Sequence, residues 1–347
     1  RELCNLLRNE PERQAMCKHA YKLGREMIWS HTAHLYMDSF QRARRSRIDE
    51  PLNPQAIQTL EERHWELPKW RLDHLLRMTD STGLLQHARY TLPNYADGYC
   101  TDDNARALLF AMYLEEMGLD TPETRRASTR YAAFVNAAFD PQRRRFRNFL
   151  GFDRHWLEEE AVGSDDCFGR AVCALGACIG RSKQRSLQSW AMEPFHSALI
   201  SSSELISPRA WAGTLIGIHE YLRRLSGDRL VNEVRETLTN RLIDFYQDTA
   251  TDDWPWFEDT LSYDNARLPH ALILSGRWTS NAEALEIGVR TLRWLTEIQR
   301  APQGHFRPIG CNGFYRRGEE RADFDQQPIE TLAMVSACVE AYRTTED

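Results

Sequence analysis

The chain has 347 residues, of which 42% are hydrophobic and 27% are charged, and its formal net charge is −6. This length supports one large domain, or one domain with an extension, around a sizeable core. Charges of both signs are spread along the chain, which excludes the clustered basic face that nucleic-acid binding requires. No apolar stretch approaches the roughly 18 residues of a membrane span. We therefore expect neither nucleic acid nor a membrane span.

Eight cysteines are present, but no two of them have CxxC spacing. A chain of this length does not need disulfides, so we expect the protein to be cytoplasmic, where thiols stay reduced. The eleven histidines are scattered, and no motif for a nucleotide, a metal or another cofactor is present. We therefore expect no cofactor and no metal.

The first 50 residues differ from the rest of the chain. Residues 11–45 have the spacing of two helices, and a polar stretch with prolines follows from Ser46 to Pro54. Such a stretch is typical of a boundary. The sequence therefore predicts an N-terminal helical extension over residues 1–50 and a main domain over residues 51–347.

Two types of helix alternate in the main domain. Helices with a charged face are predicted at residues 70–78, 122–139, 182–201, 229–249 and 281–300. Helices rich in Ala, Gly and Leu are predicted at residues 103–117, 166–180, 208–225, 264–276 and 326–342. A helix with a broad polar face lies outside, whereas one that is apolar nearly all round is buried. The alternation predicts an all-α toroid of five or six pairs, each with an outer and an inner helix.

The starts of the inner helices repeat as sequence. Asp-Asn-Ala-Arg occurs at Asp103–Arg106 and at Asp264–Arg267, and two further acidic starts lie at Asp165–Asp166 and Asp323–Gln327. The intervals are roughly 60 residues, with one longer interval that contains another inner helix. Because equivalent helix ends meet at one mouth of a toroid, these carboxylates should converge there, where helix N-termini add positive potential. Glu330, further along the last inner helix, could also face the hole.

The loops before the inner helices carry aromatic residues and glycines in short extended runs. These runs lie at residues 84–99, 146–156, 254–257 and 305–315. Short strands bounded by such residues are typical of hairpins. We therefore predict short β-hairpins in the loops at the same mouth of the toroid.

Carboxylates beside aromatic rings suit sugar chemistry, because rings stack on pyranose faces and carboxylates bind hydroxyls. Two opposed carboxyl groups can also supply a general acid and a general base. The candidate catalytic residues are Asp103, Asp166, Glu258, Asp264 and Asp325. The candidate substrate-binding residues are Tyr99, Asp102, Arg106, Trp156, Asp165, Arg170, Trp254, Trp256, Asp259, Arg267, Gln326 and Gln327.

Each candidate also has a structural interpretation. An Asp at a helix start is an N-cap by default, although one Asp suffices and two starts carry a pair. Arg106 and Arg267 follow an Asp by three residues, and Arg170 follows Asp166 by four. Each Arg could pair with its own Asp on the same helix face, which would keep that Asp ionised. Trp254 and Trp256 could instead fill the core.

The runs YCTDDNARAL, GSDDCFGRAVCALG, WPWFEDTLSYDNARLPHALI and FDQQPIETLA resemble a helical domain found behind bacterial glycosyltransferases of the GT-B type. Residues 1–45, with a late Trp29, resemble the closing helices of such a transferase. The resemblance covers residues 1–45 and 65–345, and it implies a transferase domain in the same full-length chain. The helical domain also resembles the (α/α)6 barrels of glycoside hydrolases, sugar epimerases and unsaturated-uronyl hydrolases, which is an analogy of fold.

Three functions are compatible with these features. The leading hypothesis is a glycoside hydrolase that cleaves an oligosaccharide or glycan with inversion, for which the two carboxyl groups lie about 6.5–9.5 Å apart rather than the 5–5.5 Å of retention. The second is a non-catalytic module that holds the acceptor or growing glycan for the transferase. The third is a structural or dimerising appendage, with the Asp residues used as caps and as partners of arginines.

Overall fold

A computed structural model describes residues 2–25, 28–49, 70–157 and 163–347. The chain divides into two units, Arg1–Trp70 and Arg71–Asp347. The first unit contains α1 (Glu2–Arg8), α2 (Glu10–Gly24) and α3 (Trp29–Asp49), and the last two cover the helices predicted over residues 11–45. The predicted boundary at residues 50–51 falls at the edge of a segment outside the described residues.

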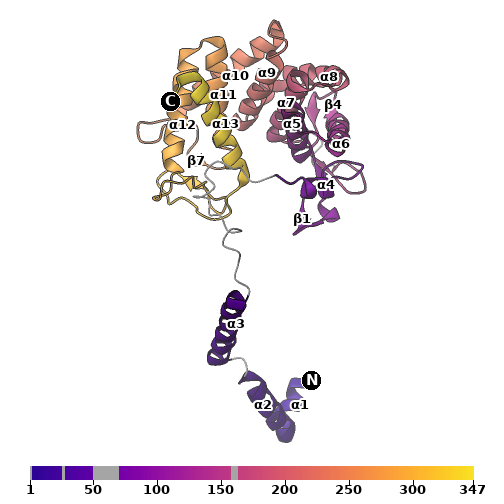
Figure 1. The fold of residues 1–347 in the computed structure, drawn as a ribbon, viewed down its shortest axis with the longest axis vertical. Helices are drawn as coiled ribbons and strands as arrows, with labels where there is room; N and C mark the ends of the chain where they lie inside the picture. Colours follow the sequence, from indigo (N-terminus) through magenta and orange to yellow (C-terminus); the bar gives the residue numbers. More distant parts are fainter. Residues whose placement is uncertain (1, 26–27, 50–69, 158–162) are drawn as a thin grey trace. The chain divides into compact units, whose positions relative to one another are not determined.

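The described residues of the second unit form five pairs of an outer and an inner helix (Figure 1). The outer helices are α4 (Asp73–Met78), α6 (Pro122–Ala138), α8 (Arg185–Ser201), α10 (Arg229–Thr249) and α12 (Ala282–Ile298). The inner helices are α5 (Thr101–Met117), α7 (Asp165–Arg181), α9 (Pro208–Leu222), α11 (Arg267–Thr279) and α13 (Pro328–Thr345). Successive inner helices are neighbours from α5 to α13. The predicted all-α toroid is confirmed.

Burial separates the two helix types. Every residue of α9 except His219 is buried, and α7 is buried almost throughout from Cys167 to Ile179. In the outer helix α10, by contrast, only one apolar stripe is buried, and the opposite face is polar and open. The core therefore fills the space between the inner and outer helices, as the alternation of apolar and amphipathic segments requires.

Four two-stranded antiparallel sheets lie in connections that run from an outer to an inner helix. They are β1–β2 (Ala88–Arg89 with Leu92–Pro93), β3–β6 (Tyr99–Cys100 with Phe149–Leu150), β4–β5 (Phe139–Asp140 with Arg145–Phe146) and β7–β8 (Thr260–Leu261 with Tyr315–Arg316). The same connections carry the 3₁₀ helices η2 (Tyr95–Asp97) and η4 (Ser202–Glu204). All of these elements therefore lie at the N-terminal ends of the inner helices, where β1 and β7 are labelled in Figure 1.

Two of the four sheets differ from the predicted hairpins. The β3–β6 sheet joins the loop before α5 to the loop before α7, and the β7–β8 sheet joins the loop before α11 to the loop before α13. Hydrogen bonds between separate loops tie neighbouring helix starts together. The mouth of the toroid is therefore a connected structure rather than a set of independent turns.

Glycines let α7 and α9 pack with their backbones in contact. A Cβ atom at Gly176 would overlap the carbonyl of Gly217, and one at Gly180 would overlap the carbonyl of Glu220. This is the most extensive helix–helix contact of the second unit. The small residues of the inner helices thus set the distance between these two helices.

We expect Gly176→Ala to lower the free energy of unfolding by about 1–3 kcal/mol, because the added methyl group must push α9 away from α7. Gly227→Ala is the matched control, since a Cβ there meets nothing within 4 Å, and its effect should stay within about 0.5 kcal/mol. Urea denaturation followed by circular dichroism measures both. Equal stability of the two variants would contradict the close packing of α7 on α9.

Candidate active site

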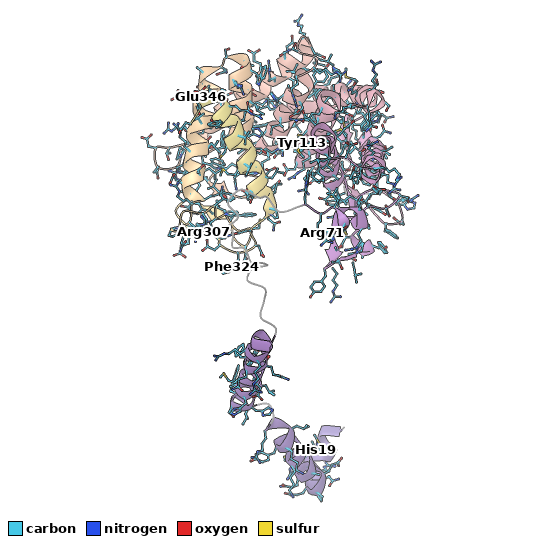
Figure 2. All side chains as sticks on the ribbon, viewed as in Figure 1. His19, Arg71, Tyr113, Arg307, Phe324 and Glu346 are labelled. Atoms are coloured by element: carbon cyan, nitrogen blue, oxygen red, sulfur yellow. The ribbon has the colours of Figure 1, made fainter. Side chains whose placement is uncertain are left out.

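A cavity of about 170 Å³ lies among the five inner helices. It is lined by Ala105, Arg106, Leu109, Phe110, Tyr113, Arg170, Cys173, Ile216, Asp264, Arg267, His270, Ile329, Leu332, Ala333 and Ser336. Its charged residues belong to the first two turns of inner helices or to the loop before α11, so its polar end faces the mouth that carries the strands. Figure 2 labels Tyr113 within the helical body and Phe324 at the end where the loops lie.

The Asp residues at the starts of α5 and α7 are not the N-caps of these helices. The Sγ atom of Cys100 accepts the N–H of Asp103 at 3.4 Å, and the Oγ atom of Ser164 accepts the N–H of Cys167 at 3.1 Å. The carboxylates instead occupy the first turn, where the helix dipole favours negative charge. The capping interpretation is therefore wrong for both helices, and their carboxyl groups are available for other contacts.

Two of the predicted Arg–Asp pairs are present. Arg106 pairs with Asp103 on α5. The Nη1 atom of Arg267 lies 3.4 Å from the Oδ2 atom of Asp264. The three-residue spacing of the repeated motif therefore has the same consequence at both helix starts, and three of these four residues line the cavity.

Arg170 does not pair with Asp166 as expected. Its Nε atom lies 3.4 Å from the Oδ1 atom of Asp102 on the neighbouring helix α5, because a long side chain on a helix leans toward the N-terminus and reaches the adjacent element. Asp166 accepts a hydrogen bond from the Oγ atom of Ser207 at 3.0 Å instead. Arg170 therefore links two inner helices at the mouth.

Asp102 has the most unusual environment of these carboxyl groups. Its side chain is only 23% exposed, and its Oδ1 atom is buried without a hydrogen-bond partner in the part of the chain that the structure describes. Burial raises the pKa of Asp102, and Asp103 and Asp166 raise it further, against the opposing effect of Arg170 and Arg106. A raised pKa is the property that a general acid requires.

Asp264 lies before α11 rather than on it. The inner helix begins at Arg267, because Asp264 adopts a left-handed backbone conformation with φ of +50°. The carboxylate of Glu330 on α13 accepts hydrogen bonds from the N–H of Asp264 and from the Nδ2 atom of Asn265, the latter at 3.1 Å. Glu330 is 1% exposed. It therefore holds the backbone of the 264–265 turn and does not face the hole.

Glu258, a predicted catalytic residue, is bound to a buried arginine. The Nη1 atom of Arg209 donates to both carboxylate oxygens of Glu258, at 3.0 and 2.7 Å. The same guanidinium donates to the Tyr263 carbonyl, the Ser262 hydroxyl and the Asn265 amide oxygen. Glu258 does not line the cavity, so it organises the loop before α11 and is not placed for catalysis.

Two of the candidate tryptophans, Trp254 and Trp256, are part of the core. Trp256 is fully buried and Trp254 is 4% exposed. Trp254 packs edge-on against Trp294 and Tyr315, and its Nε1 atom donates to the carbonyl of Glu258 at 2.8 Å. Neither indole face is open, so the prediction that they form a sugar platform is wrong.

The other predicted residues do not line the cavity. Tyr99 is buried and donates to Asp80, Trp156 packs on Phe134, and Asp165 pairs with Arg145. The exposed members of this remaining group are Asp259, Asp325, Gln326 and Gln327. Asp325, one of the predicted catalytic residues, therefore stands in an open loop before α13.

His270 was not identified from the sequence. It lies on α11 one turn beyond Arg267 and lines the cavity. Burial, helped by the charges of Arg267 and His219, lowers the pKa of His270 to about 3, so its ring is neutral at neutral pH. No motif marks this residue, and its place on an apolar inner helix alone suggests a core histidine. Phe110 and Tyr113 on the cavity wall have no sequence signal for the same reason.

The described residues show neither a metal-ligand cluster nor a membrane-spanning helix. In that part of the chain, no group of three or more His, Cys, Asp or Glu side chains is arranged to hold a metal ion. No helix there is both long enough and apolar enough to cross a bilayer.

The buried carboxyl of Glu330 should make stability depend on pH. Burial raises its pKa from 4.5 to about 7, so the folded state binds this proton more tightly than the unfolded state does. The stabilisation is complete below about pH 4.5 and is lost as the pH rises to about 7. Because one pKa unit corresponds to about 1.4 kcal/mol, the loss should reach up to about 3 kcal/mol.

Glu330→Gln is expected to remove this component. Urea denaturation of both proteins at several pH values between about 4.5 and 7 measures the difference in the free energy of unfolding. The contributions of the other carboxyl groups cancel in this difference, because those groups titrate in both proteins. Parallel stability curves for the two proteins would contradict the pKa shift of Glu330.

No protein-family model matches the chain, and no curated protein matches it. Solved structures do match the chain. A sugar epimerase from a ruminal bacterium superposes with a TM-score of 0.59 at 12% identity, over 78% of each chain. A cellobiose 2-epimerase from Bacillus thermoamylovorans B4167 superposes with a TM-score of 0.59 at 12% identity, over 80% of each chain. At this identity the likeness concerns the fold, and it confirms a helical barrel of the (α/α)6 type.

Proposed function

We propose that the second unit is a carbohydrate-active enzyme, a glycoside hydrolase that cleaves a glycosidic bond with inversion. The observation that carries this proposal is the position of Asp102, a buried carboxyl with a raised pKa beside the mouth of a cavity among inner helices. A raised pKa favours the protonated form, and a protonated carboxyl group can transfer its proton to a leaving oxygen. The fold, which resembles that of two sugar epimerases, supports a sugar substrate.

The cavity volume supports a small binding site. About 170 Å³ is less than the roughly 300–1,000 Å³ of sites for drug-sized ligands, and it suits one sugar ring. The aromatic residues Phe110 and Tyr113 on the wall offer apolar surface to the C–H groups of such a ring. We infer that the enzyme acts at the end of a glycan, with one residue of the glycan inside the cavity.

We assign the general acid to Asp102 and the general base to Asp264. Helices α5 and α11 are separated by α7 and α9 in the order of inner helices, so their starts approach the cavity from different sides. Asp264 lines the cavity, and its ion pair with Arg267 holds the carboxylate in place. Its left-handed backbone conformation is a strain of the kind found at functional sites.

Asp102→Asn and Asp264→Asn are each expected to reduce hydrolysis by about 10²–10⁴-fold, because each removes one proton transfer. The measurement is release of sugar from a panel of nitrophenyl glycosides and defined disaccharides, with the anomer of the product identified by NMR. Asp73→Asn is the matched control, since Asp73, at the start of the outer helix α4, is exposed and pairs with the exposed Arg71.

Three results would contradict this assignment. They are a retained anomeric configuration, full activity in either cavity variant, or no turnover of any glycoside by the parent protein. The last result, with binding intact, would favour the non-catalytic module that holds a glycan for a transferase.

His270 favours a second candidate function, sugar epimerisation. A neutral imidazole in the cavity can accept a proton from the carbon beside the carbonyl group of an open-chain sugar. If the resulting enediolate then rotates, the imidazolium of His270 returns the proton to its other face, which inverts that carbon. If this function holds, cellobiose incubated with the protein in D2O should gain deuterium at the inverted carbon. His270→Gln should abolish the exchange by removing the base. Exchange that persists in His270→Gln would exclude this role.

The first unit supports the proposed association with a glycosyltransferase. Large apolar side chains on α2 and α3 are exposed, including Trp29 at 86%, Tyr36 at 62% and Phe40 at 59%, and no residue of α2 is buried. Surfaces of this kind usually mark an interface. We propose that these helices are the tail of a transferase domain in the same full-length chain, whose glycan the second unit then binds.

A further inference from the structure

The guanidinium of Arg170 is buried at the cavity with unused donors. Its side chain is 9% exposed, and its Nη1 atom has no hydrogen-bond partner among the residues described. In the described structure its Nε atom lies 3.4 Å from Asp102, and the guanidinium lies over the ring of Tyr263, 5.9 Å from the ring centre. Leaving a buried charged donor unpaired is costly. A ligand that accepts hydrogen bonds from this group would remove the cost.

Two further arginines line the same cavity. Arg267 is 18% exposed and Arg106 is 46% exposed. Each makes an ionic contact with one carboxylate through one nitrogen of the guanidinium, whereas a guanidinium carries five N–H donors. Three cationic residues therefore line the cavity, against one carboxylate, that of Asp264.

The carboxylates beside the wall leave part of the Arg170 guanidinium unused. Asp103 accepts from Arg106 and also from the Sγ atom of Cys100, the latter at 3.0 Å, and Asp166 is bound to the hydroxyl of Ser207. Asp102 contacts the Nε atom of Arg170, which leaves its Nη1 atom without a hydrogen-bond partner among the described residues. Charge interactions at this apolar wall are screened little by water.

We propose that the cavity binds a sugar that carries an oxyanion, a carboxylate or a phosphate, with Arg170 as its principal partner. Planar guanidinium groups match both oxyanions through paired N–H donors. The proposal rests on the proposed function in one respect, that the cavity is the sugar site. It adds the substrate class, because an oxyanion accepts charge-assisted hydrogen bonds from the guanidinium of Arg170 that are stronger than those a neutral sugar hydroxyl accepts.

Isothermal titration calorimetry on the whole chain tests this inference without requiring turnover. The probes are methyl β-D-glucopyranoside, its C6-carboxylate analogue methyl β-D-glucuronide, and glucose 6-phosphate. We expect one or both anionic probes to bind about 10- to 100-fold more tightly than the neutral glucoside, the range for a hydrogen bond to a charged group. The anionic probe that binds more tightly identifies the source of the oxyanion.

Arg170→Gln is expected to remove that preference. Arg229→Gln is the matched control, because Arg229 lies on the outer helix α10 and its side chain is 92% exposed. Since Arg170 is buried and its loss could unfold the protein, Arg106→Gln, at a more exposed site, provides a second variant that should weaken binding of the anionic probe. Circular dichroism establishes that each variant is folded.

Equal affinity for neutral and anionic probes, no binding by either anion, or an unchanged preference in a folded Arg170→Gln protein would overturn the inference. These outcomes are separate from those of the hydrolysis assay. Anion binding that depends on Arg170, without turnover of any glycoside, would leave this inference standing and refute the hydrolase. Turnover of neutral glycosides without anion binding would do the reverse.

Discussion

The buried guanidinium of Arg209 fixes the loop on which the candidate site depends. It is 8% exposed and meets the Glu258 carboxylate, the Tyr263 carbonyl and the Ser262 hydroxyl. Glu330 holds the same loop from α13, through the Asp264 N–H and the Asn265 amide. The loop is thus fastened from α9 and from α13 at once. This double attachment offsets the roughly 1–2 kcal/mol that a left-handed residue costs, and it keeps Asp264 at the cavity.

The site is built at helix starts because other residues perform the capping. The side chains of Cys100 and Ser164 accept the hydrogen bonds from backbone N–H groups that an Asp N-cap would otherwise accept. The freed carboxylates then differ according to their surroundings. The carboxylate of Asp165 is paired with Arg145 and accepts hydrogen bonds from two backbone N–H groups. One buried oxygen of Asp102, by contrast, has no hydrogen-bond partner among the described residues. Carboxyl groups at equivalent helix starts therefore differ in role: that of Asp165 is structural, whereas that of Asp102 is chemically distinct.

The sequence was informative where the determining contacts are local. Alternating helix types and recurring Asp-rich starts predicted the toroid, and the Asp-Asn-Ala-Arg motif predicted the pairs within α5 and before α11. It failed where a partner lies far along the chain. Arg209 is 49 residues from Glu258, and Glu330 is 66 residues from Asp264, so neither bond has a spacing signature. The buried tryptophans and His270 show the same limit, because burial depends on the packed whole.

For the sugar substrate that we propose, the depth at which the ring sits would decide which chemistry the cavity performs. Arg267 and the aspartates lie at the helix starts, and His270 lies three residues further along α11, about 4.5 Å deeper at the rise of an α-helix. A ring whose glycosidic oxygen stays at the mouth meets Asp102 and Asp264. A ring that enters fully brings its carbons to His270 instead. Arg170, at the polar end of the cavity, would hold an anionic substituent near the mouth and so favours the shallower position. The charge distribution and the hydrolytic assignment thus point to the same placement of the ring.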